Sequence, residues 1–274
     1  MSKFEKIFKN PGSVWAYASM SATLTVIPEE FFTNGFVHCD WPLTMIVIMN
    51  RIWICVGIFA IANFIYRCYK KYRKSVSITR KNVAISIEYG DLYDEEKKGK
   101  IVINFDECFT TKVGQMPGDI KPNSVCGQYL TRYPIEDMQG LIKQSGVLPI
   151  GVSKFNRLPR YKLGAIVPNG DFLLMAFSEL DKEGLSRMTY EHYLECLSTL
   201  WQQIDMYHGM EDVYMPILGS KITRLDKELT QQELLDVMLA SYRLSPYKMK
   251  MSNTLHVICR RQDGFSLNNI EGFD

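Results

Sequence analysis

The stretch Leu43–Tyr66, LTMIVIMNRIWICVGIFAIANFIY, decides the organisation of this chain. It runs for 24 residues, and Arg51 is its only charged residue. As a helix it would be ~36 Å long, enough to cross a hydrocarbon core of ~30 Å with some tilt. Five cations follow within residues 67–74. An apolar run that ends in cations is typical of a membrane span stopping at the cytoplasmic face. Buried core helices seldom stay apolar for this length, so we predict a span at 43–66.

A second uncharged segment, Gly12–Ile27, lies between Pro11 and Pro28. Its 16 residues give only ~24 Å of helix, and it becomes a marginal span when extended to about residue 32. Its small residues suit close packing against another helix. A helix lying in the interface and a cleavable signal peptide are the alternatives. A signal peptide followed so closely by another span would be unusual, which favours a transmembrane hairpin of two helices.

Charge predicts the topology and the compartment. Cations precede the first apolar segment and follow the second, whereas the loop over residues 28–42 is acidic. The positive-inside rule therefore places both termini in the cytoplasm. Seven cysteines without any CxxC spacing indicate reduced thiols, with neither a disulfide framework nor a zinc site. The net charge of +2 gives no reason to expect a nucleic-acid partner.

The chain thus divides into a membrane region over residues 1–74, with a basic flank at 67–74, and a cytoplasmic domain over residues 75–274. Arg51 is the exception within the span, because a charge at the centre of a helix costs ~2.5–3.5 kcal/mol on insertion scales. Its side chain could snorkel to the outer surface. Alternatively it lines a pore or contacts Asn50 or Asn63.

Strand and helix signals alternate after Asn82, and the basic segment 67–80 is interpreted as a linker. We expect strands at 83–90, 100–105, 213–218 and 254–260, and a hairpin of 161–168 with 171–179 around Asn169-Gly170. We expect helices at 124–132, 188–207 and 230–244, the first and last capped by Ser124 and Thr230. This order predicts an α/β fold with a mixed sheet between helices.

No P-loop, GxGxxG, HExxH or GxSxG motif is present, and the four histidines have no partner at a catalytic spacing. Polar loops instead follow several expected strands, where open α/β sheets bind ligands. A glycine next to a helix start can also offer N–H groups to an anion. The candidate ligand-binding residues in these loops are Asp91, Leu92, Asn104, Asp106, Thr110, Ser124, Val125, Cys126, Gly127, Gln128, Leu218, Gly219, Ser220 and Lys221.

These loops resemble those of the macro domain, an α/β fold that binds ADP-ribose. Gly90-Asp91 looks like the Gly-Asp that ends its first strand, where the resemblance implies that Asp91 accepts a hydrogen bond from adenine. The strand 101–107 is similar to the one that leads to the ribose loop. Residues 123–127 would form the glycine-rich phosphate loop, and residues 216–221 the second phosphate loop.

Two departures bear on activity. The asparagine that assists hydrolytic macro domains would fall near Asp106 or Glu107, and the triple glycine is reduced to Gly127. The resemblance therefore implies a binding module without catalytic residues or a cofactor. An acid near the distal ribose suits a ligand with a cationic or amino-acid substituent.

Two spans, a basic linker and a divergent macro domain together resemble the membrane effector of bacterial Thoeris antiphage defence. The resemblance implies that a partner TIR-domain enzyme makes an ADP-ribose derivative, histidine-conjugated in our expectation. The macro domain would bind this derivative, and copies of the chain would then assemble. The spans would disrupt the lipid of the bacterial inner membrane, killing or arresting the cell. A membrane-anchored ADP-ribosyl hydrolase and a membrane-held adaptor for a protein partner are the alternatives.

Overall fold

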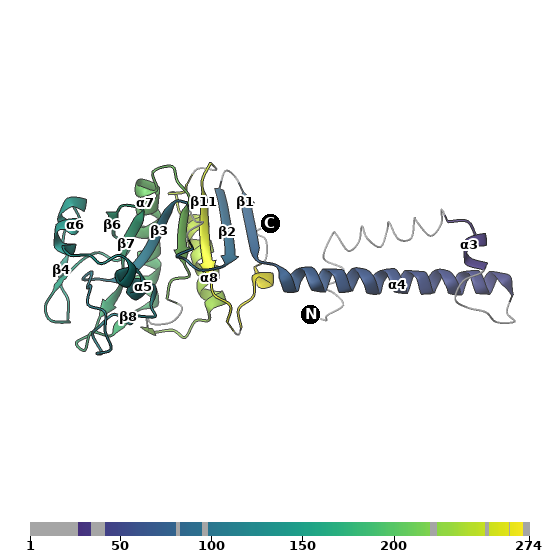
Figure 1. Ribbon diagram of the computed structural model, residues 1–274, viewed down its shortest axis with the longest axis horizontal. Helices are drawn as coiled ribbons and strands as arrows, with labels where there is room; N and C mark the ends of the chain where they lie inside the picture. The colour runs from purple at the N-terminus through teal and green to yellow at the C-terminus, as the bar shows by residue number, and fades with distance from the viewer. Residues whose placement is uncertain are drawn as a thin grey trace. The chain divides into compact units, whose positions relative to one another are not determined.

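The computed structural model describes residues 27–33, 42–80, 83–94, 98–219, 224–249, 252–262 and 264–270. The chain divides into two compact units, Met1–Tyr72 and Arg73–Asp274. The first unit contains α3 (Glu30–Thr33) and α4 (Leu43–Tyr72). The second contains the mixed sheet and the helices that cover it (Figure 1).

Helix α4 is the one helix among the described residues that is long and apolar enough to cross a membrane. It has 30 residues, and only 11% of its most apolar window is buried. It continues six residues beyond Tyr66, so Lys70 and Lys71 lie in its last turn, where cations interact favourably with the helix dipole. The expected first span at 12–32 falls mostly outside the described residues, and the two-helix hairpin stays a prediction.

Arg51 has an aromatic neighbour that the sequence did not suggest. Its guanidinium lies over the ring of Phe32, 4.9 Å from Cζ to the ring centroid. The neighbouring Asn50 donates from Nδ2 to the carbonyl of Phe32 at 2.8 Å, and Asn63 donates to the carbonyl of Phe59 within α4. A cation over an aromatic face gains more when both are removed from water. Within the first unit, this contact joins α4 to α3.

The second unit is built on a nine-stranded sheet in the order β1-β2-β11-β9-β3-β7-β8-β10, with β6 also paired to β7. The five central strands, β2, β11, β9, β3 and β7, are mutually parallel. Strand β1 pairs antiparallel to β2, and β6 and β8 pair antiparallel to β7, whereas β10 is parallel to β8. Strands β4 and β5 form a separate hairpin. The strands are β1 Ser75–Arg80, β2 Val83–Tyr89, β3 Lys100–Asp106, β4 Gly151–Val152, β5 Pro159–Arg160, β6 Ile166–Asn169, β7 Phe172–Leu180, β8 Ser186–Met188, β9 Val213–Pro216, β10 Arg224–Leu225 and β11 Thr254–Cys259.

Strand β1 corrects the interpretation of residues 67–80 as a linker. It pairs with β2 in a ladder that runs from Ser75 opposite Glu88 to Arg80 opposite Val83. Figure 1 shows β1 beside β2 at the edge of the sheet. The alternation of Val76 and Ile78 with small polar residues is a strand pattern, which the neighbouring cations obscured.

The expected helices are present, with shifted ends. They are α5 Val125–Arg132, α7 Tyr190–Tyr207 and α8 Gln231–Leu244. The structure adds α6 Met138–Ser145 and the short η1 Leu267–Asn269, which were not predicted. Ser124 and Thr230 cap α5 and α8 as predicted, and Thr230 forms a full capping box with Glu233. Helix α7 begins two residues later than expected, because residues 186–188 form β8 and Thr189 is the cap.

The predicted β6–β7 hairpin is confirmed, but its turn lies one residue later than expected. The ladder closes with Asn169 opposite Phe172, so the two loop residues are Gly170 and Asp171. Only Gly170 of the two has a positive φ, 61°. Asn169 instead belongs to the strand, and its amide donates to the hydroxyl of Tyr129 at 2.9 Å.

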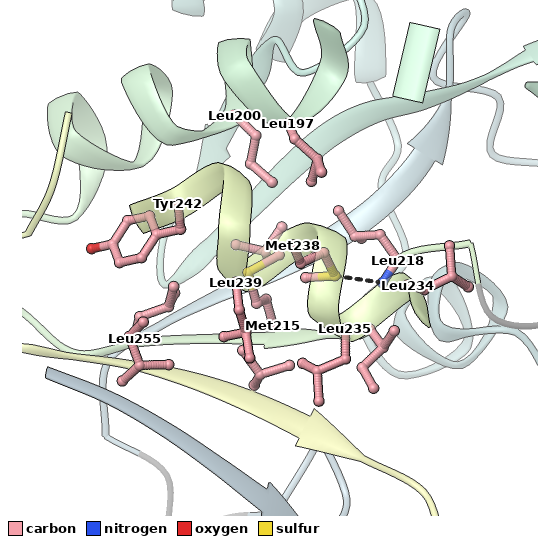
Figure 2. Close-up of a cluster of buried hydrophobic side chains, with 14 of the residues drawn as sticks. Leu197, Leu200, Met215, Leu218, Leu234, Leu235, Met238, Leu239, Tyr242 and Leu255 are labelled. Atoms are coloured by element: carbon pink, nitrogen blue, oxygen red, sulfur yellow. Dashed lines mark hydrogen bonds between the residues drawn. The ribbon is translucent and has the colours of Figure 1, made fainter. Parts of the chain in front are cut away.

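Helices cover both faces of the sheet and enclose two apolar cores. On one face, α7 and α8 pack against the strands in the larger core, and α5 and α6 pack in the smaller core on the other face. Figure 2 shows α8 of the larger core, where Met238 lies beside the backbone N–H of Leu218, 3.4 Å from Sδ to N. The side chains gathered there include Leu197, Leu200, Met215, Leu234, Leu235, Leu239, Tyr242 and Leu255.

Candidate functional site

Helices α5 and α8 follow neighbouring parallel strands but lie on opposite faces of the sheet, and this locates a crevice at the sheet edge. Strands β3 and β9 are parallel neighbours, yet α5 follows β3 on one face and α8 follows β9 on the other. At such a switch point the chain leaves adjacent strands in opposite directions, so a crevice opens outside their carboxyl ends. Both helices begin at this edge, so their N-termini, the positive ends of the helix dipoles, lie near it.

A pocket of about 320 Å³ occupies this edge. Residues at the ends of all five parallel strands line it: Gly90 after β2, Asp106 in β3, Ser178 in β7, Pro216 in β9 and Arg260 after β11. The first turn of α5 closes one side, and Gln231 of α8 reaches it from the other. Pockets of this size at a strand edge are the usual location of ligand sites in α/β folds.

The structure brings eight of the fourteen sequence-predicted residues into the wall of this pocket. They are Leu92, Asn104, Asp106, Thr110, Ser124, Val125, Cys126 and Gly219. Asp91, Gly127 and Leu218 are next in sequence to lining residues but do not line the pocket themselves. Gln128 does not line it either, and its Nε2 donates to the carbonyl of the lining residue Asn123 at 3.2 Å. Ser220 and Lys221 lie outside the described residues.

The start of α5 provides the backbone donors of the pocket. Ser124 Oγ accepts a hydrogen bond from the N–H of Gly127 at 2.9 Å, which satisfies one of the orphan donors of the first turn. The N–H groups of Val125 and Cys126 have no acceptor within the described chain. These two donors and the helix dipole favour an anion beside them.

Gly127 contributes to this site by allowing close packing and not by contact with a ligand. Because its N–H is bound to Ser124, it has no backbone donor left for a ligand. A Cβ at this position would lie 2.2 Å from the carbonyl oxygen of Lys121 and 3.0 Å from Cα of Pro122. Only glycine therefore allows the loop at 121–122 to pack against α5 and to bring Ser124 to the helix start.

Asp106 holds the loop between β3 and α5 in a tight turn. Its Oδ1 accepts from the N–H groups of Cys108 at 2.8 Å and Thr110 at 3.3 Å, and its Oδ2 accepts from the Thr110 hydroxyl. Phe109, within this turn, has a φ of 52°. Burial raises the pKa of the Asp106 carboxyl above its ordinary value, although these hydrogen bonds oppose the shift. The Asp106 carboxylate thus accepts hydrogen bonds from its own loop. This weakens the expectation that the carboxylate binds a cationic group of a ligand.

We expect the free energy of unfolding of Asp106→Asn relative to that of wild type to increase as pH rises. Because the pKa of Asp106 is raised in the folded state, that state binds the proton more tightly than the unfolded chain. The contribution of Asp106 is therefore largest below the unfolded pKa of ~3.9, and it declines as pH rises through the folded value. Urea unfolding of both proteins between pH 4 and pH 8 measures the difference, and a constant difference would contradict this assignment.

Glu107 turns away from the pocket. It is 3% exposed, and its Oε1 accepts from Ser153 Oγ at 2.5 Å and from the N–H of Leu180 at 3.3 Å. Its Oε2 lies 3.9 Å from Nη1 of Arg160. Of the two acids that the sequence placed near the distal ribose, only Asp106 lines the pocket.

Tyr93 joins the loop after β2 to the start of α5. Its hydroxyl donates to the carbonyl of Val125, and the guanidinium of Arg132 lies 4.6 Å from its ring centroid. Its N–H donates to Oδ1 of Asp91 at 3.2 Å. Asp91 itself is exposed and lies between the lining residues Gly90 and Leu92. Tyr93 thereby connects the loop expected to contact adenine to the start of α5, where the phosphate is expected.

Sequence reasoning missed several lining residues. Ligands bind at the carboxyl ends of parallel strands, and this rule would have identified Ser178 and Arg260 if it had been applied to β7 and β11. Residues 117–121 and 184–186 reach the pocket because their loops pack together, with Gly184 close to Gly118. No local pattern marks Gln231, which is one of several polar residues at the start of a helix.

Comparison with known proteins agrees with this geometry. The family described as Thoeris protein ThsA, macro domain, matches residues 85–260, which run from β2 to the end of β11 and contain every strand end of the pocket. This chain belongs to the ThsA macro-domain family. It is also similar to the Thoeris protein ThsA of Bacillus amyloliquefaciens (strain Y2), with 25% identity over 278 residues, 98% of this chain and 91% of the relative.

ThsA membership confirms the macro-domain resemblance read from the four loops, and it supports a role in antiphage defence. The similarity to the full-length ThsA covers residues on both sides of Tyr72, so it extends beyond the macro domain into the unit that contains α4.

Proposed function

We propose that this chain is a membrane-anchored sensor in which the macro domain binds an ADP-ribose-derived signal. The observation that carries the proposal is the pocket of about 320 Å³ at the β3–β9 switch point, which is lined by Val125 and Cys126. The N–H groups of these two residues have no acceptor among the described residues. This arrangement suits a diphosphate. Among the lining residues, Leu92 and Ile258 add apolar surface, which suits a nucleobase.

The signal, in this proposal, is made from NAD by a TIR-domain partner and carries histidine on its distal ribose. Asn104 supports a ribose near β3, because its Oδ1 is enclosed beside the pocket without a donor. A hydroxyl of a ribose is a matching donor. Asp106 is occupied by its own loop, so the distal group must be recognised by other residues.

The response proposed is assembly of several copies and disruption of the inner membrane by the spans. Only Arg73 and Lys74 join α4 to β1, and β1 is paired along its whole length to β2, which leads to the pocket. A ligand can drive assembly only if it binds the assembled form better than the resting one. A shift from ~1:99 to ~99:1 requires ~10⁴-fold preference, or ~5.5 kcal/mol.

Sensing is favoured over hydrolysis by the state of the acids in the pocket. The acids among its described lining residues are Asp106 and Asp119. Asp106 is bound by the loop, and Asp119 lies 3.0 Å from Lys112 Nζ while accepting the N–H of Met116 at 3.1 Å. A general base requires a carboxylate within reach of the attacking water. Both carboxylates already have protein donors.

The proposal is tested with the full-length chain in lipid nanodiscs, titrated with ADP-ribose and with its histidine conjugate. Recovered ligand is then analysed by chromatography, and dye release from vesicles carrying the protein is recorded. We expect binding of intact ligand, preference for the conjugate, and dye release only when it is present. Recovery of cleaved ligand would indicate the hydrolase, and absence of binding to both compounds would overturn the sensor.

Asp91→Ala should weaken ligand binding at least about tenfold while leaving expression and membrane insertion unchanged. The carboxylate accepts from the N–H of Tyr93 and, in the macro-domain resemblance, from adenine. Loss of a charged acceptor typically costs ~1.5–3 kcal/mol. Asp94→Ala, three residues further along the same exposed loop, is the control. Equal affinity of Asp91→Ala and wild type for the conjugate would refute the adenine contact.

A further inference from the structure

Gln231 is a buried polar residue that lines the pocket, and its side-chain oxygen has no hydrogen-bond donor among the described residues. It lies in the first turn of α8, one turn before Leu234 and Leu235, which face the sheet in the larger core. The residue is 8% exposed and lines the pocket, and its Oε1 has no hydrogen-bond partner among the residues that the structure describes. A buried acceptor without a donor is unfavourable, so such a group in a pocket indicates a contact with a ligand.

The chemistry of the two sides of the pocket differs. Around the start of α5 the chain offers N–H donors, which match the oxygens of a phosphate. Asn104 Oδ1 from β3 and Gln231 Oε1 from α8 offer acceptors, which phosphate oxygens cannot satisfy. In the orientation that the two amides have in the structure, a ligand that satisfies them carries O–H or N–H donors in addition to its phosphates.

The position of Gln231 selects among these donors. The other lining residues from the β9–α8 connection are Ile217 and Gly219, and the latter belongs to the expected second phosphate loop. In a dinucleotide-like ligand the groups next to the diphosphate on either side are sugars. A sugar hydroxyl is therefore the nearest donor to an acceptor in this connection.

We propose that Gln231 determines specificity for a ribosylated ligand by accepting a hydrogen bond from a ribose hydroxyl. This inference rests on the proposed binding of an ADP-ribose compound, and it adds a contact from α8 that no loop motif contains. Asn104 accepts the second hydroxyl contact across the crevice. Together the two amides distinguish a nucleoside diphosphate sugar from phosphate or a polyphosphate without hydroxyls.

The test uses the full-length chain in nanodiscs and compares ADP-ribose with analogues lacking one ribose hydroxyl each, and with the inosine analogue, which lacks the 6-amino group. Gln231→Met removes the amide at similar length. Gln232→Met is the matched control, because its amide is also enclosed without partners but does not line the pocket. For wild type and the control, we expect one deoxy analogue to bind about tenfold more weakly than ADP-ribose.

In Gln231→Met we expect that tenfold difference to fall to less than about twofold, with ADP-ribose itself bound about tenfold more weakly. If every deoxy ratio stays at its wild-type value in Gln231→Met, the hydroxyl contact is refuted while the sensor proposal stands. If only the ratio for the inosine analogue collapses, Gln231 reads the base and the hydroxyl assignment is overturned. Failure of wild type to bind ADP-ribose would overturn both.

Discussion

Gly127→Ala is expected to lower the affinity for ADP-ribose by about 10–100-fold, equivalent to ~1.4–2.7 kcal/mol. The added Cβ would stand 2.2 Å from the carbonyl oxygen of Lys121, so either α5 or the loop at 121–122 must move. Movement of α5 displaces the N–H groups of Val125 and Cys126, which we propose hold the diphosphate. Steric insertion of this kind typically destabilises a well-packed site by ~1–3 kcal/mol.

Calorimetric titration of the full-length variant measures the affinity, and circular dichroism with thermal unfolding establishes that it remains folded. Thr131→Ala is the control on the same helix, because Thr131 is exposed and its hydroxyl only bonds back to the carbonyl of Gly127. If Gly127→Ala binds ADP-ribose as wild type does, the phosphate lies elsewhere than at the start of α5. The titration is made at a temperature where the variant is fully folded. A lower thermal midpoint therefore does not by itself explain a loss of affinity for ADP-ribose.

Local patterns predicted the elements whose cause is local. The caps at Ser124 and Thr230 follow from side chains that satisfy the first N–H groups of a helix, and this needs no tertiary information. The apolar runs of β3 and β9 likewise indicated strands buried on both faces, since parallel strands are covered by helices. Among the predicted helices the errors lie at the ends, as at Met188, where a cap and a short strand compete for the same residues, whereas β1 and α6 were missed altogether.

The site was less predictable because its members are brought together by the sheet. Asp106 has the residue type of a ligand contact, but its hydrogen bonds to Cys108 and Thr110 are set by the turn that follows β3. Gln231 is 125 residues from Asp106 in sequence and reaches the same pocket through the β9–α8 connection. Only the strand order places these residues together, and no sequence period encodes that order.

Trp201→Ala is expected to lower the free energy of unfolding of the macro-domain unit by ~3–5 kcal/mol. Trp201 is 2% exposed in the larger core, and its ring centroid lies 4.9 Å from that of Tyr242 on α8. Its indole N–H donates to Ser241 Oγ at 2.9 Å. The side chain thus fills the contact between α7 and α8, and its removal leaves a cavity that rigid helices close only in part. Urea unfolding followed by circular dichroism measures the change.

Trp201→Phe should cost less than Trp201→Ala, because it keeps one aromatic ring and removes only the N–H and the second ring. Ser241 Oγ retains its own hydrogen bond to the carbonyl of Met238 at 2.9 Å, so the loss of the indole bond alone should cost ~0.5–1.5 kcal/mol. Trp201 does not line the pocket, so both variants should bind ADP-ribose within about twofold of wild type while folded. A loss below ~1 kcal/mol for Trp201→Ala would mean that α7 and α8 are not close-packed. A parallel loss of affinity would mean that the α7–α8 layer sets the position of Gln231 in the pocket, coupling the core to ligand recognition.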